Sequence, residues 1–415
     1  MKYFGTDGIR GKVFEDLTPS LAYRLGKSLF VLKKKKVFIA YDTRESCNLL
    51  LHSIVSGALS CGISIIDIGI ASTPCLAYLT RIHCCYGVMI TASHNPYYDN
   101  GMKLIYQGHK VSDALEKKIE IAMQFGHRVL KLGTYQKNEE LKKDYIFHLK
   151  QWLTPYSGRI LIDTANGATC EIAKEIWKEN PLVDFCANHP NGKNINRGVG
   201  ATHCAYLKRK VKEGNYDLGF AFDGDGDRIQ VITSRGKIID GEMLLSIFAM
   251  MERQRKVVLT HLANLGIEKN LKRRGIKVYH AKVGDRYVKE RMNQTHASLG
   301  AEGSGHLIYM PYSPTGDGVW SALKLIEICS KNNLKVENML DFISSWPSFL
   351  YSFTLPMKAG VLMEILNWIK TKKGKNVRCI LRKSGTEKKY RVYFCASSKK
   401  MVINAKRQLL EILNQ

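Results

Sequence analysis

The fold is decided by residues 36–91, which read KVFIAYDTRESCNLLLHSIVSGALSCGISIIDIGIASTPCLAYLTRIHCCYGVMIT. In this stretch, runs of β-branched and aliphatic residues alternate with longer segments whose apolar residues recur at helical spacing. The alternation predicts strands at 36–41, 64–70 and 87–91, and helices at 48–61 and 73–82. Strands that alternate with helices in this way indicate a doubly wound α/β layer with a parallel sheet.

The same alternation continues along the chain, and four domains are predicted from it. A second α/β unit opens with the strand Arg159–Asp163 and has Asp217–Phe222 as its last strand. A third has strands near 257–260 and 276–279, and the remaining tail has the strand and helix order of a small α+β domain. Further helices are predicted at 113–125, 139–153, 361–371 and 405–413. The predicted domains are residues 1–153, 154–241, 242–348 and 349–415.

Composition indicates a folded protein without an export signal. The chain has 415 residues, of which 45% are hydrophobic and 24% charged, enough for several packed domains. No apolar run approaches the ~20 residues of a membrane span, and the N-terminus lacks the apolar core of a signal peptide. We therefore expect a cytoplasmic protein with no membrane partner. Its 11 cysteines show no paired C-x-x-C spacing, so reduced thiols are expected rather than a zinc site.

The net charge of +26 raises the question of nucleic acid binding, because Lys and Arg clusters supply its sequence-independent part. No helix-turn-helix, zinc finger or RNP pattern accompanies the clusters. The charge therefore predicts a solvated basic surface, part of which attracts an anionic substrate. Nucleic acid is not expected as a partner, although a basic nucleic-acid-binding protein stays open as an alternative of another class.

The segment MITASHNP, residues 89–96, places a serine in a polar turn directly after an apolar strand. Ligands of open α/β folds bind at the carboxyl ends of strands, and Pro96 prevents a helix from starting behind Ser93. A serine hydroxyl is a weak nucleophile, so here it suits a phosphoryl carrier beside a metal and a proton-transfer group. The chain brings Lys103 back towards Ser93, where a lysine can transfer protons to a phosphoryl group. Lys103 therefore favours a phosphoryl carrier over the alternative, a turn in which Ser93 is only a capping residue.

The segment FAFDGDGDR, residues 220–228, carries the strongest signal. Asp223, Asp225 and Asp227 repel one another unless a cation compensates, and the intervening glycines let the backbone turn so that the carboxylates converge. Oxygen ligands without His or Cys favour Mg²⁺. An EF-hand loop does not fit, because its sixth position would be Arg228. The alternative is a solvated acidic turn.

Two further segments suit a phosphorylated sugar. In GAEGSGH, residues 300–306, Glu302 and Ser304 suit sugar hydroxyls, and His306 suits a phosphate or a proton transfer, although a glycine-rich turn is the alternative. In LRKSGTE, residues 381–387, a turn with hydroxyls beside Arg382 and Arg391 makes an anion nest, whereas the alternative is a hairpin turn. Neither a Walker A segment nor G-x-G-x-x-G occurs, so no motif supports a nucleotide.

At these residues the chain resembles the α-D-phosphohexomutase superfamily, and within it most closely the bacterial phosphoglucosamine mutases. The resemblance spans nearly the whole length. It rests on these segments, in this order: GTDGIRG (5–11), 91–103, 223–228, VGDRYV (283–288), 302–306, TGDG (315–318) and 382–387. It implies three α/β domains and a C-terminal α+β domain of the TATA-binding-protein-like kind around a central cleft.

The resemblance also implies roles for individual residues. Ser93 is the implied phosphoserine, and its phosphate is implied to hold one Mg²⁺ together with Asp223, Asp225 and Asp227. The implied sugar and phosphate ligands are Asp285, Glu302, Ser304, Arg382, Ser384, Gly385, Thr386 and Arg391. The groups implied to line the reacting centre are Arg10, Lys103, Arg228 and His306. The implied reaction converts glucosamine 6-phosphate to glucosamine 1-phosphate through a 1,6-bisphosphate, and so supplies UDP-N-acetylglucosamine for the cell envelope.

The chain departs from the family pattern at three points, and the first of them, Gly303, keeps a second substrate open. Gly303 stands where the glucosamine branch usually has Gln, Lys388 replaces a usual Pro, and the chain is somewhat short. A phosphoglucomutase or phosphomannomutase of the same superfamily is therefore the alternative. No motif predicts the oligomeric state.

Overall fold

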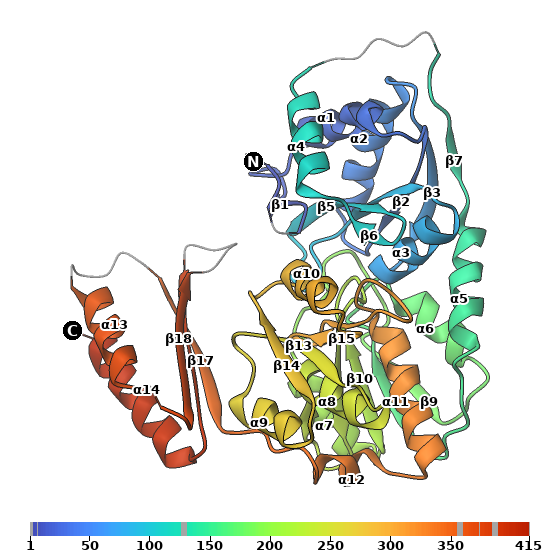
Figure 1. The fold of residues 1–415 in the computed structure, drawn as a ribbon. Helices are drawn as coiled ribbons and strands as arrows, with labels where there is room; N and C mark the ends of the chain where they lie inside the picture. The colour runs from blue at the N-terminus through green and yellow to red at the C-terminus, as the bar shows by residue number, and fades with distance from the viewer. Residues whose placement is uncertain are drawn as a thin grey trace. The chain divides into compact units, whose positions relative to one another are not determined.

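The computed structural model describes residues 3–5, 7–125, 131–354, 360–372, 374–383 and 389–414 (Figure 1). The chain forms two compact units. Unit 1 consists of Met1–Gly241 and Ser304–Lys335, and unit 2 consists of Glu242–Gly303 and Val336–Gln415. The chain thus leaves unit 1 after Gly241, returns to it at Ser304 and leaves it again after Lys335. The division into four domains stays a prediction.

The first sheet of unit 1 positions the serine loop. Its strand order is β1-β5-β4-β2-β3-β7, with β6 paired to β5. The strands are β1 (Ile9–Lys12), β2 (Lys36–Tyr41), β3 (Ser64–Ile70), β4 (Tyr86–Ile90), β5 (Asp99–Tyr106), β6 (His109–Lys110) and β7 (Tyr135–Lys137). The pairs that β2 makes with β3 and β4 are parallel, as predicted, and β7, which was not predicted, pairs parallel to β3. However, β5 runs antiparallel to β4 and β1, because the short loop 91–98 cannot make a crossover.

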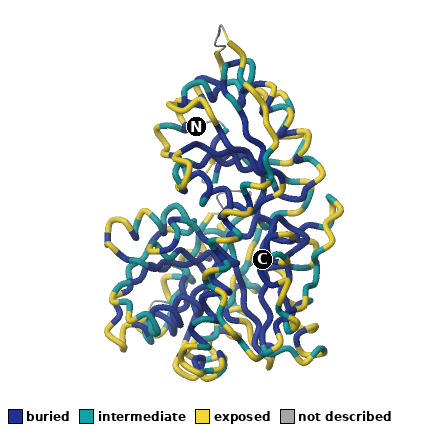
Figure 2. Tube along the Cα trace, turned by 90° about the vertical axis from the view of Figure 1, so that its right-hand side faces the viewer, coloured by how far each residue is buried: buried dark blue, intermediate teal, exposed yellow. Residues whose placement is uncertain are grey.

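Helices accompany this sheet, and some of their N-termini carry side-chain caps. They are α1 (Pro19–Ser28), α2 (Cys47–Leu59), α3 (Thr73–Ile82), α4 (Asp113–Ala122) and α5 (Lys142–Lys150), with short 3-10 segments η1 (Leu29–Val31) and η2 (Glu139–Leu141). Thr18 caps α1 through a bond from the Leu21 amide, and Ser72 caps α3 through one from Cys75. In place of the single helix predicted at 139–153, the structure has the 3-10 segment η2 followed by α5. Strands β2, β3 and β4 are mostly buried, whereas β7 is exposed; Figure 2 shows the burial along the chain.

The second sheet of unit 1 has the order β12-β11-β10-β8-β9. Its strands are β8 (Ile160–Asp163), β9 (Val183–Cys186), β10 (Leu218–Phe222), β11 (Ile229–Thr233) and β12 (Ile238–Ile239), and its helices include α6 (Cys170–Trp177) and α7 (Ala205–Glu213). The prediction that 217–222 is the last strand was wrong. The acidic turn after β10 is short, so the chain folds back as the antiparallel strand β11. Unit 1 also contains β16 (Leu307–Tyr309) and α11 (Gly318–Asn332).

Unit 2 contains a parallel sheet and a separate antiparallel one. The parallel strands are β13 (Lys256–Thr260), β14 (Lys277–Ala281) and β15 (Leu299–Ala301), with helices α8 (Gly241–Met251), α9 (Leu265–Arg273), α10 (Asp285–Thr295) and α12 (Val336–Leu340). The antiparallel sheet has the order β17-β19-β18, formed by β17 (Ser348–Thr354), β18 (Val377–Lys383) and β19 (Lys389–Ala396).

Two helices pack on the antiparallel sheet, α13 (Val361–Thr371) and α14 (Lys399–Leu413) (Figure 1). Helix α14 begins before the predicted start at residue 405. Its first turn is mostly exposed and basic, so its helical pattern is visible only from Val402, which is buried with Ala405 and Leu409. The tail is therefore the α+β layer that the sequence predicts.

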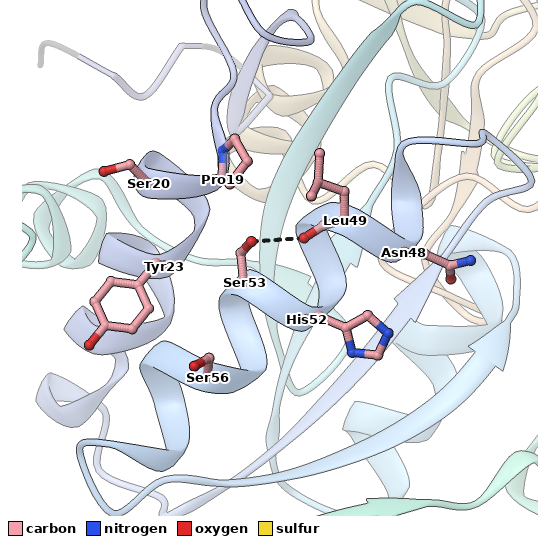
Figure 3. A pocket seen from close by; sticks show the side chains of 8 residues that line it. All are labelled: Pro19, Ser20, Tyr23, Asn48, Leu49, His52, Ser53 and Ser56. Atoms are coloured by element: carbon pink, nitrogen blue, oxygen red, sulfur yellow. Dashed lines mark hydrogen bonds between the residues drawn. The ribbon is translucent and has the colours of Figure 1, made fainter.

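A groove on the surface of unit 1 lies between α1 and α2 (Figure 3). It is lined by Pro19, Ser20, Tyr23, Asn48, Leu49, His52, Ser53 and Ser56. The Ser53 hydroxyl is already used, because it donates to the Leu49 carbonyl at 2.8 Å. The lining shares no residue with the predicted site and offers no carboxylate, so we do not place the chemistry here. In the described part of the chain, no helix is both long and apolar enough to span a membrane.

Candidate active site

Ser93 lies in the loop between β4 and β5, and its hydroxyl faces the acidic triplet. The side chain is buried, and Oγ donates to Asp223 Oδ2 at 2.6 Å. The backbone of Ser93 is left-handed, with φ of 52°. This conformation is uncommon for a residue with a side chain and is found mostly where the surrounding structure enforces it. The structure thus joins a serine and an aspartate that are 130 residues apart.

The acidic triplet occupies the turn between β10 and β11. Asp223, Asp225 and Asp227 are all buried, and each has a carboxylate oxygen that lies within 4.8 Å of those of the others. The two glycines have different roles. Gly226 has φ of 75°, whereas Gly224 allows a close approach, because a Cβ atom there would lie 2.6 Å from the Ser93 carbonyl oxygen.

The three carboxylates differ in their electrostatics. Burial, with the neighbouring charges of Asp227 and Asp225, raises the pKa of Asp223 well above its ordinary value. Burial also opposes ionisation of Asp225, but Lys103 and a 2.6 Å hydrogen bond from Thr73 Oγ1 outweigh it and hold the pKa of Asp225 low. Such a group of carboxylates favours a bound cation.

The triplet fits a divalent metal. Among the described residues, Asp225 Oδ1 and Asp227 Oδ1 are buried oxygens with no hydrogen-bond partner. Buried polar atoms are normally satisfied, so two such carboxylate oxygens in one turn suit a bound cation. Hard oxygen ligands without a nearby thiolate suit Mg²⁺.

Lys103 on β5 supplies the cation nearest to the triplet. Its Nζ lies 2.9 Å from Asp225 Oδ2 and 3.1 Å from Asp7 Oδ2. Burial alone would lower the pKa of Lys103, but Asp225 and Asp7 outweigh burial and raise it above its ordinary value. Lys103 is therefore an ammonium group beside the acidic triplet.

Asp7 is a site residue to which the sequence analysis assigned no role. It lies just before β1 and pairs with Arg10, Lys103 and Lys110. Burial would raise the pKa of Asp7, but these three cations hold it well below its ordinary value. Arg10 also donates to the Ala92 carbonyl at 3.5 Å, so it lies beside the serine loop as expected. The signal was present in GTDGIRG, where Asp7 and Arg10 are three residues apart.

Arg228 and His306 lie on the other side of the triplet. Arg228 Nε is 3.8 Å from Asp223 and 3.7 Å from Asp227, and Arg228 forms a β-bridge with His306. His306 Nε2 accepts from the Gly316 amide at 3.3 Å, so the proton of the neutral ring is on Nδ1. That Nδ1 lies 3.5 Å from Asp227 Oδ1. The TGDG motif thus orients the imidazole.

His94 is a second residue that the sequence analysis did not single out. Its Nδ1 lies 3.4 Å from Ser93 Oγ. Burial and the charges of Arg228 and Arg10 lower the pKa of His94 to about 3, so this imidazole is neutral near pH 7. No spacing in the sequence distinguishes it from an ordinary turn residue.

In unit 2, the predicted sugar-binding glutamate is held by the VGDRYV motif. Glu302 is buried, and its Oε1 accepts from the Gly284 amide at 2.7 Å. Gly284 has φ of 126° and directly precedes Asp285, the first residue of α10. The structure therefore brings Glu302 and the Asp285 segment together. Ser304 belongs to unit 1, two residues before His306.

Arg382 and Arg391 are directly opposite each other on β18 and β19. Burial and the charge of Arg391 lower the pKa of Arg382. Like charges at directly paired strand positions are unfavourable unless an anion lies between them, which is the environment that a phosphate needs. Ser384, Gly385 and Thr386 of the predicted phosphate loop, with Lys388, lie outside the described residues.

Comparisons with known proteins agree with this geometry. Residues 1–127 match the family model described as phosphoglucomutase/phosphomannomutase, alpha/beta/alpha domain I, and residues 240–345 match the model of domain III. A phosphoglucosamine mutase of Nautilia profundicola is 38% identical over 417 residues, which cover 94% of each chain. The chain belongs to the phosphoglucosamine mutase family. Members of this family are phosphohexomutases, which are isomerases.

Solved structures show the same fold. One is a phosphoglucomutase/phosphomannomutase family protein of Burkholderia thailandensis, which is 20% identical to this chain. The TM-score is 0.83, and the match covers 99% of this chain and 96% of that chain. The N-acetylphosphoglucosamine mutase of Aspergillus fumigatus, solved in complex with GlcNAc-6P and magnesium, is 16% identical. Its TM-score is 0.63, over 91% of this chain and 82% of that chain.

Proposed function

We propose that the protein interconverts glucosamine 6-phosphate and glucosamine 1-phosphate through a phosphorylated Ser93 and a 1,6-bisphosphate. The observation that carries the proposal is the 2.6 Å contact between Ser93 Oγ and the Asp223 carboxylate. It places a hydroxyl that can carry a phosphoryl group against a cluster of oxygen ligands. Family membership and the two opposed arginines of unit 2 support the same reaction.

The reaction has two phosphoryl transfers. In the first, the sugar C1 hydroxyl attacks the phosphorus on Ser93 and gives up its proton, the bond to Ser93 Oγ breaks and Oγ gains a proton, and glucosamine 1,6-bisphosphate forms. After the sugar turns over, Ser93 Oγ attacks the 6-phosphoryl group and gives up its proton. The bond from phosphorus to the C6 oxygen breaks, that oxygen gains a proton, and glucosamine 1-phosphate is left. Phosphoryl transfer depends mainly on positioning and on electrostatic stabilisation. The left-handed Ser93 and the surrounding cations supply both.

The charged groups of unit 1 have separate tasks in this scheme. Asp223, Asp225 and Asp227, with the Ser93 phosphate, would hold one Mg²⁺, which would offset charge on the transferring oxygens. Lys103 is protonated, so it is suited to give a proton to the departing Ser93 oxygen and to take it back in the second transfer. Arg10 and Arg228 stabilise the charge on the phosphoryl oxygens, and His306 is a second group for proton transfer.

The residues of unit 2 are assigned to the rest of the substrate. Arg382 and Arg391 bind the phosphate that is not being transferred, with Ser384, Gly385 and Thr386 as proposed partners. Glu302, Ser304 and Asp285 are assigned to the sugar. We propose a cytoplasmic location, where the product serves UDP-N-acetylglucosamine synthesis. No nucleic acid or membrane partner is part of this proposal.

The test is the replacement Ser93→Ala, with Ser53→Ala as a control from the α1 and α2 groove. Ser93→Ala is expected to abolish turnover, whereas Ser53→Ala is expected to retain it. Intact mass and peptide mapping of the purified protein should show about 80 Da added at residue 93, the mass of a phosphoryl group. Full mutase activity in Ser93→Ala would end the proposal.

A second substrate is kept open by Gly303. Among the residues that the structure describes, the nearest atoms to a Cβ at this position would be those of the Glu242 side chain, with Oε1 at 3.3 Å, so the site has no side chain where the family usually has Gln. This favours a second candidate function, a phosphoglucomutase or phosphomannomutase. Comparison of kcat/KM for glucosamine 6-, glucose 6- and mannose 6-phosphate decides between them. A preference for glucose or mannose would overturn the assignment to glucosamine.

A further inference from the structure

The backbone of the serine loop is gripped by two side chains outside the reacting centre, Arg44 and Asn196. We propose that both are positioning residues, which hold Ser93 in the left-handed conformation that directs its hydroxyl at Asp223. The inference rests on the proposed function, because the role of Ser93 as phosphoryl carrier gives this alignment its purpose. Neither residue touches the reacting atoms.

Arg44 follows β2 and is buried beneath the loop. Its Nε donates to Asp42 Oδ2 at 2.9 Å, and both side chains of this ion pair are inaccessible to solvent. Its two terminal nitrogens donate to four backbone carbonyls, those of Ser93, Asn95, Pro96 and Asp99. A guanidinium has five N–H donors in a fixed plane, and here each of the five has an acceptor. Such a fixed fork holds the loop in one shape.

Asn196 holds the same loop from the second sheet. It lies between β9 and α7, and its Nδ2 donates to the Ser93 carbonyl at 2.8 Å and to the Asn95 carbonyl at 3.2 Å. These are two of the carbonyls that Arg44 holds. The serine loop is therefore fixed to the sheet that bears it by Arg44, and to the sheet that bears the acidic triplet by Asn196.

The amide side of Ser93 is fixed as well. Its N–H donates to Thr91 Oγ1 at 2.8 Å, and the Thr91 hydroxyl donates to Asp42 Oδ2 at 2.6 Å. Asp42 in turn pairs with Arg44. A left-handed φ of 52° at a residue with a side chain persists only when its surroundings over-determine it, and here the contacts on both sides do so.

The rival explanation is that Asn196 only fills space. The replacement Asn196→Asp separates the two explanations, because Asp has the same shape and also tolerates the left-handed backbone of this residue, whose φ is 57°. It exchanges the donating amide for an oxygen that faces two carbonyl oxygens. A residue that only fills space tolerates this exchange, whereas a donor that positions the loop does not.

The experiment compares Asn196→Asp and Arg44→Lys with the control Asn194→Asp. Asn194 lies in the same loop as Asn196, but its side chain bonds His189 and Asn191. The measurements are kcat and KM with glucosamine 6-phosphate, and hydrogen exchange of the amides of residues 91–97. For Asn196→Asp and Arg44→Lys we expect faster exchange in this segment, an unchanged KM and a kcat about 100-fold lower, the loss that a misplacement of about 1 Å can cause. The control should match the wild type.

The outcomes distinguish this proposal from the proposed function. Wild-type kcat and exchange in Asn196→Asp would overturn it, and so would faster exchange with unchanged kcat, because the residue would then be structural only. If Arg44→Lys does not fold, Asn196→Asp still decides. Absence of mutase activity in the wild type would instead end the proposed function, while the exchange measurement would still show whether Asn196 holds the loop.

Discussion

Asp7 shows how one carboxylate organises the cations of the site. It pairs with Arg10, Lys103 and Lys110, and so fixes the ammonium group that faces Asp225. A hydrogen bond to a charged group contributes about 1.5–3 kcal/mol, so Asp7→Asn is expected to lower kcat by roughly 10- to 150-fold. Steady-state kinetics with glucosamine 6-phosphate tests this. The control is Glu15→Gln, which breaks an exposed pair with Lys12 and should leave kcat unchanged. Equal kcat in Asp7→Asn and the wild type would contradict the assignment.

At the scale of residues, the sequence predicts reactive groups better than the groups that hold them. Ser93, Lys103 and the acidic triplet are recognisable because each chemistry demands its residue type in a local pattern. Asn196 carries no such pattern, since its partner is the backbone of a segment 103 residues away. Every residue has a backbone carbonyl group, so a side chain that bonds to one leaves no recognisable pattern in the sequence.

The paired arginines of β18 and β19 make a prediction at the scale of the element. Arg382 lies opposite Arg391, so Arg382→Gln removes a repulsion and is expected to preserve or raise the thermal stability while KM for glucosamine 6-phosphate rises. Arg378→Gln on the same strand is the matched control. Arg378 pairs with the buried Glu268, so its loss should lower the melting temperature and leave KM unchanged. A fall in stability with unchanged KM in Arg382→Gln would contradict the phosphate assignment.

Elements with strong periodicity were predicted closely, whereas strands that follow short turns were not. The strand Ser64–Ile70 and the helices Thr73–Ile82 and Val361–Thr371 have the predicted bounds, because their apolar spacing is regular, and Ser72 also caps the first of these helices. Neither β5 nor β11 was predicted as a strand. Both follow short turns, and the length of a connection becomes known only once the next strand is recognised.

At the scale of the whole molecule, the linear order of the chain conceals how its segments are grouped. Residues Ser304–Lys335 belong to unit 1, although the sequence analysis placed them in a third block with 242–303. Compactness depends on contacts between distant segments, and periodicity reports only local structure. Composition likewise gives the net charge of +26, but it does not tell where on the surface the charged side chains lie.

The acidic triplet leads to a prediction about the stability of the molecule. Three buried carboxylates in one turn repel one another, so Mg²⁺ should raise the melting temperature, by a stabilisation of about 2.7 kcal/mol when its concentration is 100 times its Kd. A chelator should remove this gain from the wild type. Asp223→Asn should lose most of the response to Mg²⁺, because it removes one ligand and one of the repelling charges. Asp184→Asn, which changes an exposed carboxylate that pairs with Arg159, should retain the full response. Thermal unfolding of the three proteins with Mg²⁺ and with chelator measures the difference, and an equal shift in Asp223→Asn and the wild type would place the metal elsewhere.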